Sequence, residues 1–328
     1  MKRLILVILL TIGWSAPALA PPIPDAKQCY QATLPGSGIS PDRAILHCTR
    51  AIRSGYLSRR DKATTYNNRG IAYGRKGDLD RAIADYGEAI RLNPDYVSAY
   101  YNRGIRYRIL REYDRAIADY NAVIRLKPDF AEALRNRGIA YSRKGDLDHA
   151  IADFDKAIGL KPNYADALRD RGYAYYLKGK YDQAIAGFTQ SIRHQPKDAL
   201  AFYNRAKAYR NKGEYDLAIR DFGQAIRLNP NDAHALNGKA WLLATAPQDG
   251  LRDGAEAVGL AKRAFSLSNR VGFLDTLAAA HAEAGDFKEA IGAQQRAIQM
   301  LRNQGKIKAI ADYESRLRRY QQGRPFRN

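Results

Sequence analysis

The 328-residue sequence has little of what catalytic and metal sites are usually built from. It contains only two cysteines, and its five histidines stand apart from one another, at His47, His149, His194, His234 and His281. No two of them have the helical spacing of metal ligands, and neither a phosphate-binding glycine loop nor a nucleophile elbow is present. These absences predict a protein that is not an enzyme and that uses no cofactor and no metal.

An apolar run near the start of the chain predicts export. Basic residues 2–3 precede the apolar residues 4–14, which are too few to span a bilayer, and small residues follow them. We therefore expect residues 1–20 to be a signal peptide, cleaved after Ala18 or Ala20, with an uncleaved helix as the alternative. The mature chain would be periplasmic or secreted, and would have no stable membrane span.

Acidic residues are outnumbered by basic ones, 34 against 54, and the formal net charge is +20. Such a charge favours acidic or polyanionic partners. The two cysteines, Cys29 and Cys48, follow the predicted signal, and in an exported chain we expect them to form a disulfide. Closing a loop of about 20 residues would contribute about 3 kcal/mol. Two inert buried thiols are the alternative.

A pattern with a period of 34 residues fills the middle of the chain. The triplet Asn-Arg-Gly, or a close variant of it, begins at positions 68, 102, 136, 170 and 204. Further on in each unit stands a large aromatic residue: Tyr86, Tyr120, Phe154, Phe188 and Phe222. A proline closes each unit, and apolar residues spaced by three and four predict two helices before it. Such short helices are marginal alone, so the units are expected to stack.

The period, the small residues, the aromatic residues and the closing proline resemble the tetratricopeptide repeat family over residues 63–232. The resemblance implies an all-α fold, a right-handed superhelical solenoid of antiparallel helix pairs. It also implies that the first helices line a concave surface that holds a peptide or protein segment. We expect about seven such units and a C-terminal capping helix.

The regular units are flanked by less regular segments on both sides. We expect residues 21–62 to form a truncated first unit, whose own first helix is missing or replaced. Residues 233–305 are expected to form two divergent units, with an inserted loop at 245–254. A capping helix at 306–322 and a disordered tail at 323–328 complete the predicted organisation.

An arginine precedes the small residue of each regular unit, and in four of the five units an aspartate stands sixteen residues later. The predicted structural pairs are Arg69 with Asp85, Arg103 with Asp119, Arg137 with Asp153, and Arg205 with Asp221. A guanidinium can meet a carboxylate with two hydrogen bonds, so we expect ion pairs between the two helices of a unit. Ligand binding by these arginines is the alternative. Arg171 has Gly187 at the aspartate position and is expected to turn toward solvent or the groove.

The concave groove is expected to be basic and to contain tyrosines. The predicted partner-binding residues are Tyr101, Arg108, Arg135, Arg143, Arg169, Tyr173, Tyr176, Tyr203, Lys207 and Arg210. Cationic groups beside tyrosines suit an acidic segment with aromatic or apolar anchors. An ordinary solvated face is the alternative. The carboxylate clamp of some family members is not expected, because the lysine near the start of the first helix is absent.

The sequence therefore predicts a non-catalytic scaffold in the periplasm or cell envelope that binds a protein or peptide, with an acidic partner, in its basic, tyrosine-containing concave groove. The alternative is a protein that binds polyanions, either an acidic envelope polymer or nucleic acid. Nucleic acid is the unlikely form of this alternative, because export removes the chain from most of it.

Overall fold

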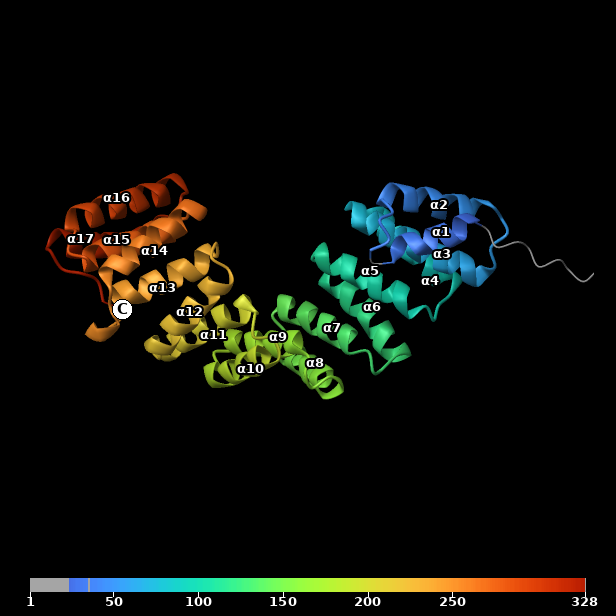
Figure 1. The fold of residues 1–328 in the computed structure, drawn as a ribbon, viewed down its shortest axis with the longest axis horizontal. Coiled ribbons are helices and arrows are strands. Elements are labelled where there is room, and N and C mark those ends of the chain that lie inside the picture. Colours follow the sequence, from blue (N-terminus) through green and yellow to red (C-terminus); the bar gives the residue numbers. More distant parts are fainter. Residues whose placement is uncertain (1–23, 35, 328) are drawn as a thin grey trace, which may run out of the picture. The chain divides into compact units, whose positions relative to one another are not determined.

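The computed structural model describes residues 24–34 and 36–327, and within them the regular structure is entirely helical. The predicted signal peptide lies outside the described residues. The chain divides into two compact parts, which we call the N-terminal part (residues 1–128) and the C-terminal part (residues 129–328). In both parts, helices that follow one another in the sequence pack as pairs (Figure 1). The fold is therefore an all-α helical solenoid, as the repeat predicts.

The described residues of the N-terminal part form three helix pairs. Its helices are α1 (Pro24–Thr33), α2 (Pro41–Arg53), α3 (Arg59–Lys76), α4 (Leu79–Leu92), α5 (Val97–Ile109) and α6 (Tyr113–Leu126). The first unit is not missing its first helix, because α1 packs against α2 and is joined to it by the Cys29–Cys48 disulfide. Both cysteines are fully buried. The disulfide stabilises this helix pair, whose helices are too short to bury a large core.

The C-terminal part continues with the same pairing. Its regular helices are α7 (Ala131–Lys144), α8 (Leu147–Leu160), α9 (Ala165–Leu177), α10 (Tyr181–His194), α11 (Ala199–Lys212) and α12 (Tyr215–Leu228). Its less regular helices are α13 (Ala233–Thr245), α14 (Gly254–Leu267), α15 (Val271–Glu283), α16 (Phe287–Asn303) and α17 (Ile310–Gln321). The inserted loop separates α13 from α14, and α17 packs against α16 as a cap.

The turn inside most regular pairs uses a glycine in the left-handed region. Gly77, for example, has φ 86° and ends α3, and the next residue, Asp78, caps α4 by accepting from the backbone N–H of Arg81. Between α5 and α6 this position holds Arg111, which adopts φ 63° with a Cβ in place.

The core of each regular pair is an aromatic ring beneath a small residue. Phe154 of α8 is almost fully buried, and a Cβ added to Gly138 of α7 would lie 2.8 Å from its ring. The same contact recurs between Gly70 and Tyr86, and between Gly104 and Tyr120. The glycine therefore lets the first helix approach the ring closely, which explains why the triplet and the aromatic residue recur together.

The four predicted arginine–aspartate positions are in contact. Arg103 donates from Nε and Nη2 to both carboxylate oxygens of Asp119, at 2.9 and 2.7 Å. The other pairs have the same two-bond geometry: Arg69 with Asp85, Arg137 with Asp153, and Arg205 with Asp221. The aspartate side chains are at most 10% exposed. Each pair therefore ties the first helix of a unit to the second.

Arg171 departs from the expectation that it would turn to solvent or to the groove. Its Nη1 donates to Asp155 at 2.7 Å, a residue of α8 in the preceding unit, and its Nη2 donates to Gln190. Gly187 offers no carboxylate at the aspartate position, and a Cβ there would lie 3.0 Å from the Cα of Gly172. The close approach of α9 and α10 thus excludes an aspartate and redirects the arginine.

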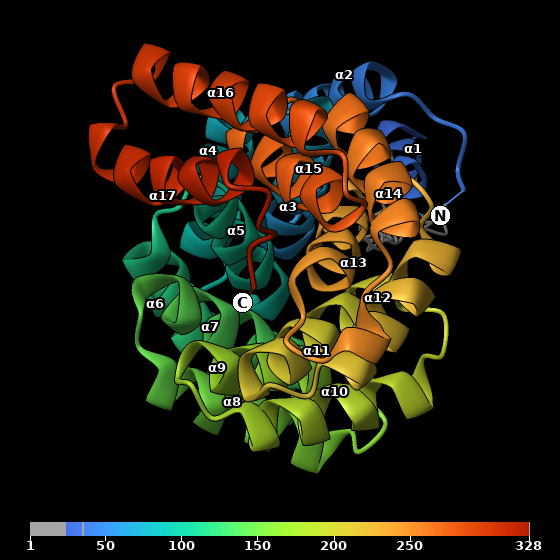
Figure 2. The ribbon, with the colours of Figure 1, turned by 90° about the vertical axis from the view of Figure 1, so that its left-hand side faces the viewer.

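The segment after α17 also departs from prediction. Residues 323–327 are described and ordered by contacts, not disordered as expected, because Phe326 packs into the last apolar cluster beside Tyr320. A single aromatic ring can supply enough apolar contact to fix a short segment. The Phe326 ring lies 5.8 Å from that of Trp241 on α13, and the end of the segment is drawn near α13 in Figure 1. Figure 2 shows α17, from which the segment leads, lying alongside α16.

Candidate functional site

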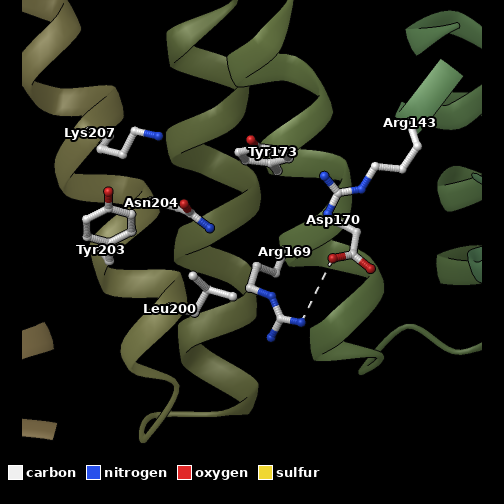
Figure 3. A pocket seen from close by; sticks show the side chains of 8 residues that line it. All are labelled: Arg143, Arg169, Asp170, Tyr173, Leu200, Tyr203, Asn204 and Lys207. Atoms are coloured by element: carbon white, nitrogen blue, oxygen red, sulfur yellow. Dashed lines mark ion pairs between the residues drawn. The ribbon is translucent and has the colours of Figure 1, made fainter. Parts of the chain in front are cut away.

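The first helices of the C-terminal part lie against one another, α7 on α9 and α9 on α11, so their shared side is the inner face of this part. The inner face is hollowed by a cavity of about 330 Å³. It is lined by Arg143 of α7, by Arg169, Asp170 and Tyr173 of α9, and by Leu200, Tyr203, Asn204 and Lys207 of α11 (Figure 3). We call this cavity the inner hollow.

Two of the predicted binding arginines are held in ion pairs between units. Arg135 donates from Nε to Asp170 at 2.7 Å, and Arg169 donates from Nη1 to Asp198 at 2.5 Å. Arg169 also pairs with Asp166 at 2.7 Å, and its side chain is only 13% exposed. Two arginines thus face three aspartates, and this end of the hollow is not basic. The sequence predicts Arg135 and Arg169 as partner-binding residues, and the structure shows both already paired with carboxylates, of Asp166, Asp170 and Asp198.

These ion pairs are structural as well as electrostatic. Asp198 caps α11 by accepting from the backbone N–H groups of Leu200 and Ala201, and it also accepts from Arg169. Burial raises the pKa of Asp170, although Arg135 and Arg169 favour its charged form. Replacing either arginine would therefore strand a carboxylate at the joint between two units.

The positive charge without an ion-pair partner lies on α7 and α11, on either side of α9 (Figure 3). Among the described residues, no carboxylate forms an ion pair with Arg143, Lys207 or Arg210. The ammonium group of Lys207 lies 4.7 Å from the ring centroid of Tyr176 and 5.6 Å from that of Tyr203. Burial, and then Arg210, lower the pKa of Lys207, since both disfavour its charge. An anion placed beside Lys207 would relieve both effects.

The tyrosines of the hollow are fixed by packing. Tyr173 and Tyr176 stack with their ring centroids 6.1 Å apart, and the Tyr176 hydroxyl accepts from Asn211. Tyr203 rests on Phe222, with the centroids 5.9 Å apart. Rings held in this way offer contact area without a large loss of rotamer freedom on binding. Figure 3 shows the Arg143 side chain pointing toward Tyr173 and Asp170.

The remaining two predicted residues belong to the N-terminal part. Tyr101 and Arg108 both lie on α5, and the Tyr101 ring is 6.2 Å from that of Tyr120. Both side chains are partly buried. They are therefore described apart from the inner hollow.

Three lining residues of the hollow were not predicted. Asp170 replaces the asparagine of the repeated triplet, and this departure was the one signal that it differs from its equivalents. Asn204 retains that asparagine, and Leu200 lies near the start of α11. Their role could not be read from spacing within one unit, because the hollow is formed by three successive first helices.

Other kinds of site find no support in the part of the chain that the structure describes. There, no group of three or more His, Cys, Asp or Glu side chains is placed to hold a metal ion. Over the same residues, no helix is both long enough and apolar enough to cross a membrane.

Comparisons with known proteins agree on the repeat. Models described as tetratricopeptide repeat match residues 104–167 and 199–232, and one described as TPR repeat matches residues 75–109 and 172–213. No curated protein matches the chain.

Solved structures share the fold. A tetratricopeptide repeat protein from Parabacteroides merdae is 21% identical, with a TM-score of 0.59, over 78% of this chain and 97% of that one. PilF of Pseudomonas aeruginosa is 18% identical, with a TM-score of 0.57, over 66% of this chain and 97% of that one. MamA is 29% identical over 50% of this chain and 96% of its own, with a TM-score of 0.47. The family models, the 34-residue period and the paired helices together show that the chain belongs to the tetratricopeptide repeat family.

Proposed function

We propose that this protein-interaction scaffold binds an acidic peptide segment in the inner hollow. The observation that carries the proposal is the separation of charge within it. Arg135 and Arg169 are neutralised by aspartates, whereas Lys207 and Arg143 have no carboxylate partner among the described residues. A carboxylate of a bound segment would supply the missing partner for a cation that burial has already partly desolvated.

The hollow also indicates how such a segment would lie. The aspartates beside Arg135 and Arg169 would repel its acidic residue, which would therefore sit toward Lys207, the lining cation that lies away from them (Figure 3). The rings of Tyr173 and Tyr203 would contact an aromatic or apolar residue beside it. Leu200 and Asn204 add an apolar surface and an amide hydrogen-bonding group.

The binding should be tested with a defined probe, a fluorescein-labelled peptide of alternating Glu and Tyr, by fluorescence anisotropy. Lys207→Glu and Arg143→Glu should each weaken binding about tenfold, which corresponds to about 1.4 kcal/mol. The matched control is Lys156→Glu, which makes the same charge change at an exposed position of α8. A peptide with Gln in place of Glu should bind poorly.

The outcome that contradicts the proposal is equally specific. If Lys207→Glu and Arg143→Glu bind the acidic peptide as the native chain does, the hollow is an ordinary solvated face. Circular dichroism should accompany each variant, so that a folding defect is not read as lost binding.

Binding to polyanions is a second candidate, favoured by the net charge of +20. It makes a different prediction for the same variants, because a polyanion senses charge over the whole surface. Heparin or single-stranded DNA would then displace the peptide, and Lys156→Glu would weaken binding as much as Lys207→Glu does. The two candidates are thus separated by the control variant.

We also propose that the scaffold works in the periplasm or cell envelope. The order of charged, apolar and small residues in 1–20 supports export, and the Cys29–Cys48 disulfide suits an oxidising compartment. The intact mass of the protein recovered from an envelope fraction tests this. Cleavage after Ala18 or Ala20 is expected, and a chain that retains Met1 would contradict it.

A further inference from the structure

The segment that follows α17 folds back onto the helices before it. Gly323 has φ 67°, and the backbone N–H of Arg324 donates to the carbonyl of Arg319 at 2.9 Å. Arg319 in turn donates to the carbonyl of Pro325. Pro325, Phe326 and Arg327 are all partly buried, so this segment lies against the molecule.

Phe326 occupies a place between two helices. Its ring centroid lies 5.8 Å from that of Trp241 on α13, and the Arg316 guanidinium of α17 lies 5.5 Å from its centroid. It also packs against the last apolar cluster, which contains alanines of α15 and α16 and Tyr320 of α17. An aromatic ring held between a tryptophan and a cation is a specific contact.

Arg327 meets a carboxylate whose position is already fixed. Its Nη1 lies 2.6 Å from Oε2 of Glu283, at the end of α15, but it is not aligned as a hydrogen bond. Oε1 of Glu283 accepts from Arg252 at 2.9 Å. Arg252 also donates to the carbonyls of Ala246 and Pro247, which fixes the inserted loop around the carboxylate.

The position of Trp241 in the repeat relates these contacts to the inner hollow. It stands 34 residues after Lys207 and 68 after Tyr173, which both line the inner hollow. It therefore has the same register on its first helix as two residues of that hollow. Phe326 lies where a bound peptide would lie if α13 used its inner face as α9 and α11 do.

We propose that α13 and α15 form a second peptide-binding site, for a segment in which an aromatic residue is followed by an arginine, and that residues 324–327 occupy this site in the native chain. Its chemistry is opposite to that of the inner hollow, because Glu283 supplies a carboxylate to this site, whereas Lys207 supplies a cation to the hollow. A tethered segment has an effective concentration on the order of millimolar, so it blocks weaker segments and yields to stronger ones.

The test uses a fluorescein-labelled peptide with the sequence of residues 321–328 as the probe. The native chain should bind it poorly, because its own segment competes. The double variant Phe326→Ala, Arg327→Ala should bind it at least about tenfold more tightly. In that opened chain, Trp241→Ala or Glu283→Gln should remove most of the gain, whereas Glu289→Gln on the exposed side of α16 should not.

Trp241 provides a second readout. The chain has two tryptophans, and Trp14 lies in the predicted signal peptide, so a chain without residues 1–20 has Trp241 as its only tryptophan emitter. Opening the site should increase its quenching by acrylamide, and the probe peptide should reverse the increase. A peptide with alanine in place of its phenylalanine should do neither.

A folded, opened chain that does not bind the probe would overturn the proposal and leave the segment as a structural cap. If the double variant does not fold, Arg327→Glu keeps the question decidable, since it repels Glu283 and retains Phe326. That variant should bind the probe more tightly than the native chain, and equal or weaker binding would overturn the proposal as well.

Discussion

The regular helices α3 to α12 and the last five helices, α13 to α17, fill their cores in different ways. From α4 to α12, every second helix buries a tyrosine or phenylalanine beneath a small residue. At the equivalent positions, α14 has Ala261 and α16 has Gln294. The volume missing from these helices is supplied by elements outside the repeat, since Phe326 and Tyr320 complete the last apolar cluster. The end of the array therefore depends on residues that no repeat unit contains.

Gln294 shows that the polar chemistry also changes partners. Its amide donates to Asp275 of α15 at 2.9 Å and to the carbonyl of Tyr313 at 3.0 Å. Arg316 of α17 donates to Asp275 at 2.8 Å. Burial raises the pKa of Asp275, as it does for the Asp85 carboxyl of the regular array. The same ion-pair chemistry that closes a unit in the regular helices here holds the capping helix onto the last unit.

The largest effects on stability are expected when the core residue of each region, Phe154 or Gln294, is replaced by that of the other. Phe154→Gln places an amide in an apolar core and removes a fully packed ring, so it should cost about 4 kcal/mol of unfolding free energy. Gln294→Phe should also destabilise, by about 2 kcal/mol, because Ala278 stands where four of the five regular units have glycine and because Asp275 loses a donor.

Urea unfolding of both variants measures these costs. If Gln294→Phe proved stabilising, the packing of the last unit would not require a polar residue at this position.

The repeat arginines should differ in their contribution to stability, because their partner carboxylates are buried to different extents. Arg103→Ala strands the carboxylate of Asp119, which is only 6% exposed, and should cost about 3 kcal/mol. Arg171→Ala should cost less than about 1 kcal/mol, because Asp155 is 49% exposed and water replaces the arginine. Chemical denaturation of the two variants side by side measures the difference. Equal losses would show that the pairs do not act through burial.

Two glycines of the same helix pair give the smallest expected effects, with opposite signs. Gly138→Ala should destabilise by about 1 kcal/mol, since the added methyl meets Phe154 at 2.8 Å. Gly159→Ala, on the open side of α8, should stabilise by about 0.5 to 1 kcal/mol, because nothing lies within 4 Å and alanine favours a helix. Thermal melts of the two variants resolve the sign, and a stabilising Gly138→Ala would show that the ring can yield, as it does beside Ala206.

Much of the fold could be predicted because it repeats. Spacing within one unit indicates both helices, the ring beneath the glycine and the arginine–aspartate positions sixteen residues apart. The charge of the hollow could not be predicted in this way, because Arg135 and Arg169 find Asp170 and Asp198 at separations of 35 and 29 residues. Contacts between units need the stacking geometry. That residues 323–327 are ordered was not predicted, because their polar composition suggested a free end. The packing of Phe326 against the last apolar cluster orders them.

The arginines of the repeat also reach backward along the chain. Besides its aspartate, Arg69 donates to Thr49, and Arg205 donates to Thr189, each on the preceding second helix. Arg171 also reaches backward, because its Nη1 donates to Asp155 of α8. A chain made from its N-terminus exposes each acceptor before the arginine, and the arginine before its own aspartate. Each emerging first helix can therefore dock onto finished structure while its partner helix is still unmade, so assembly can proceed from the N-terminus one helix at a time.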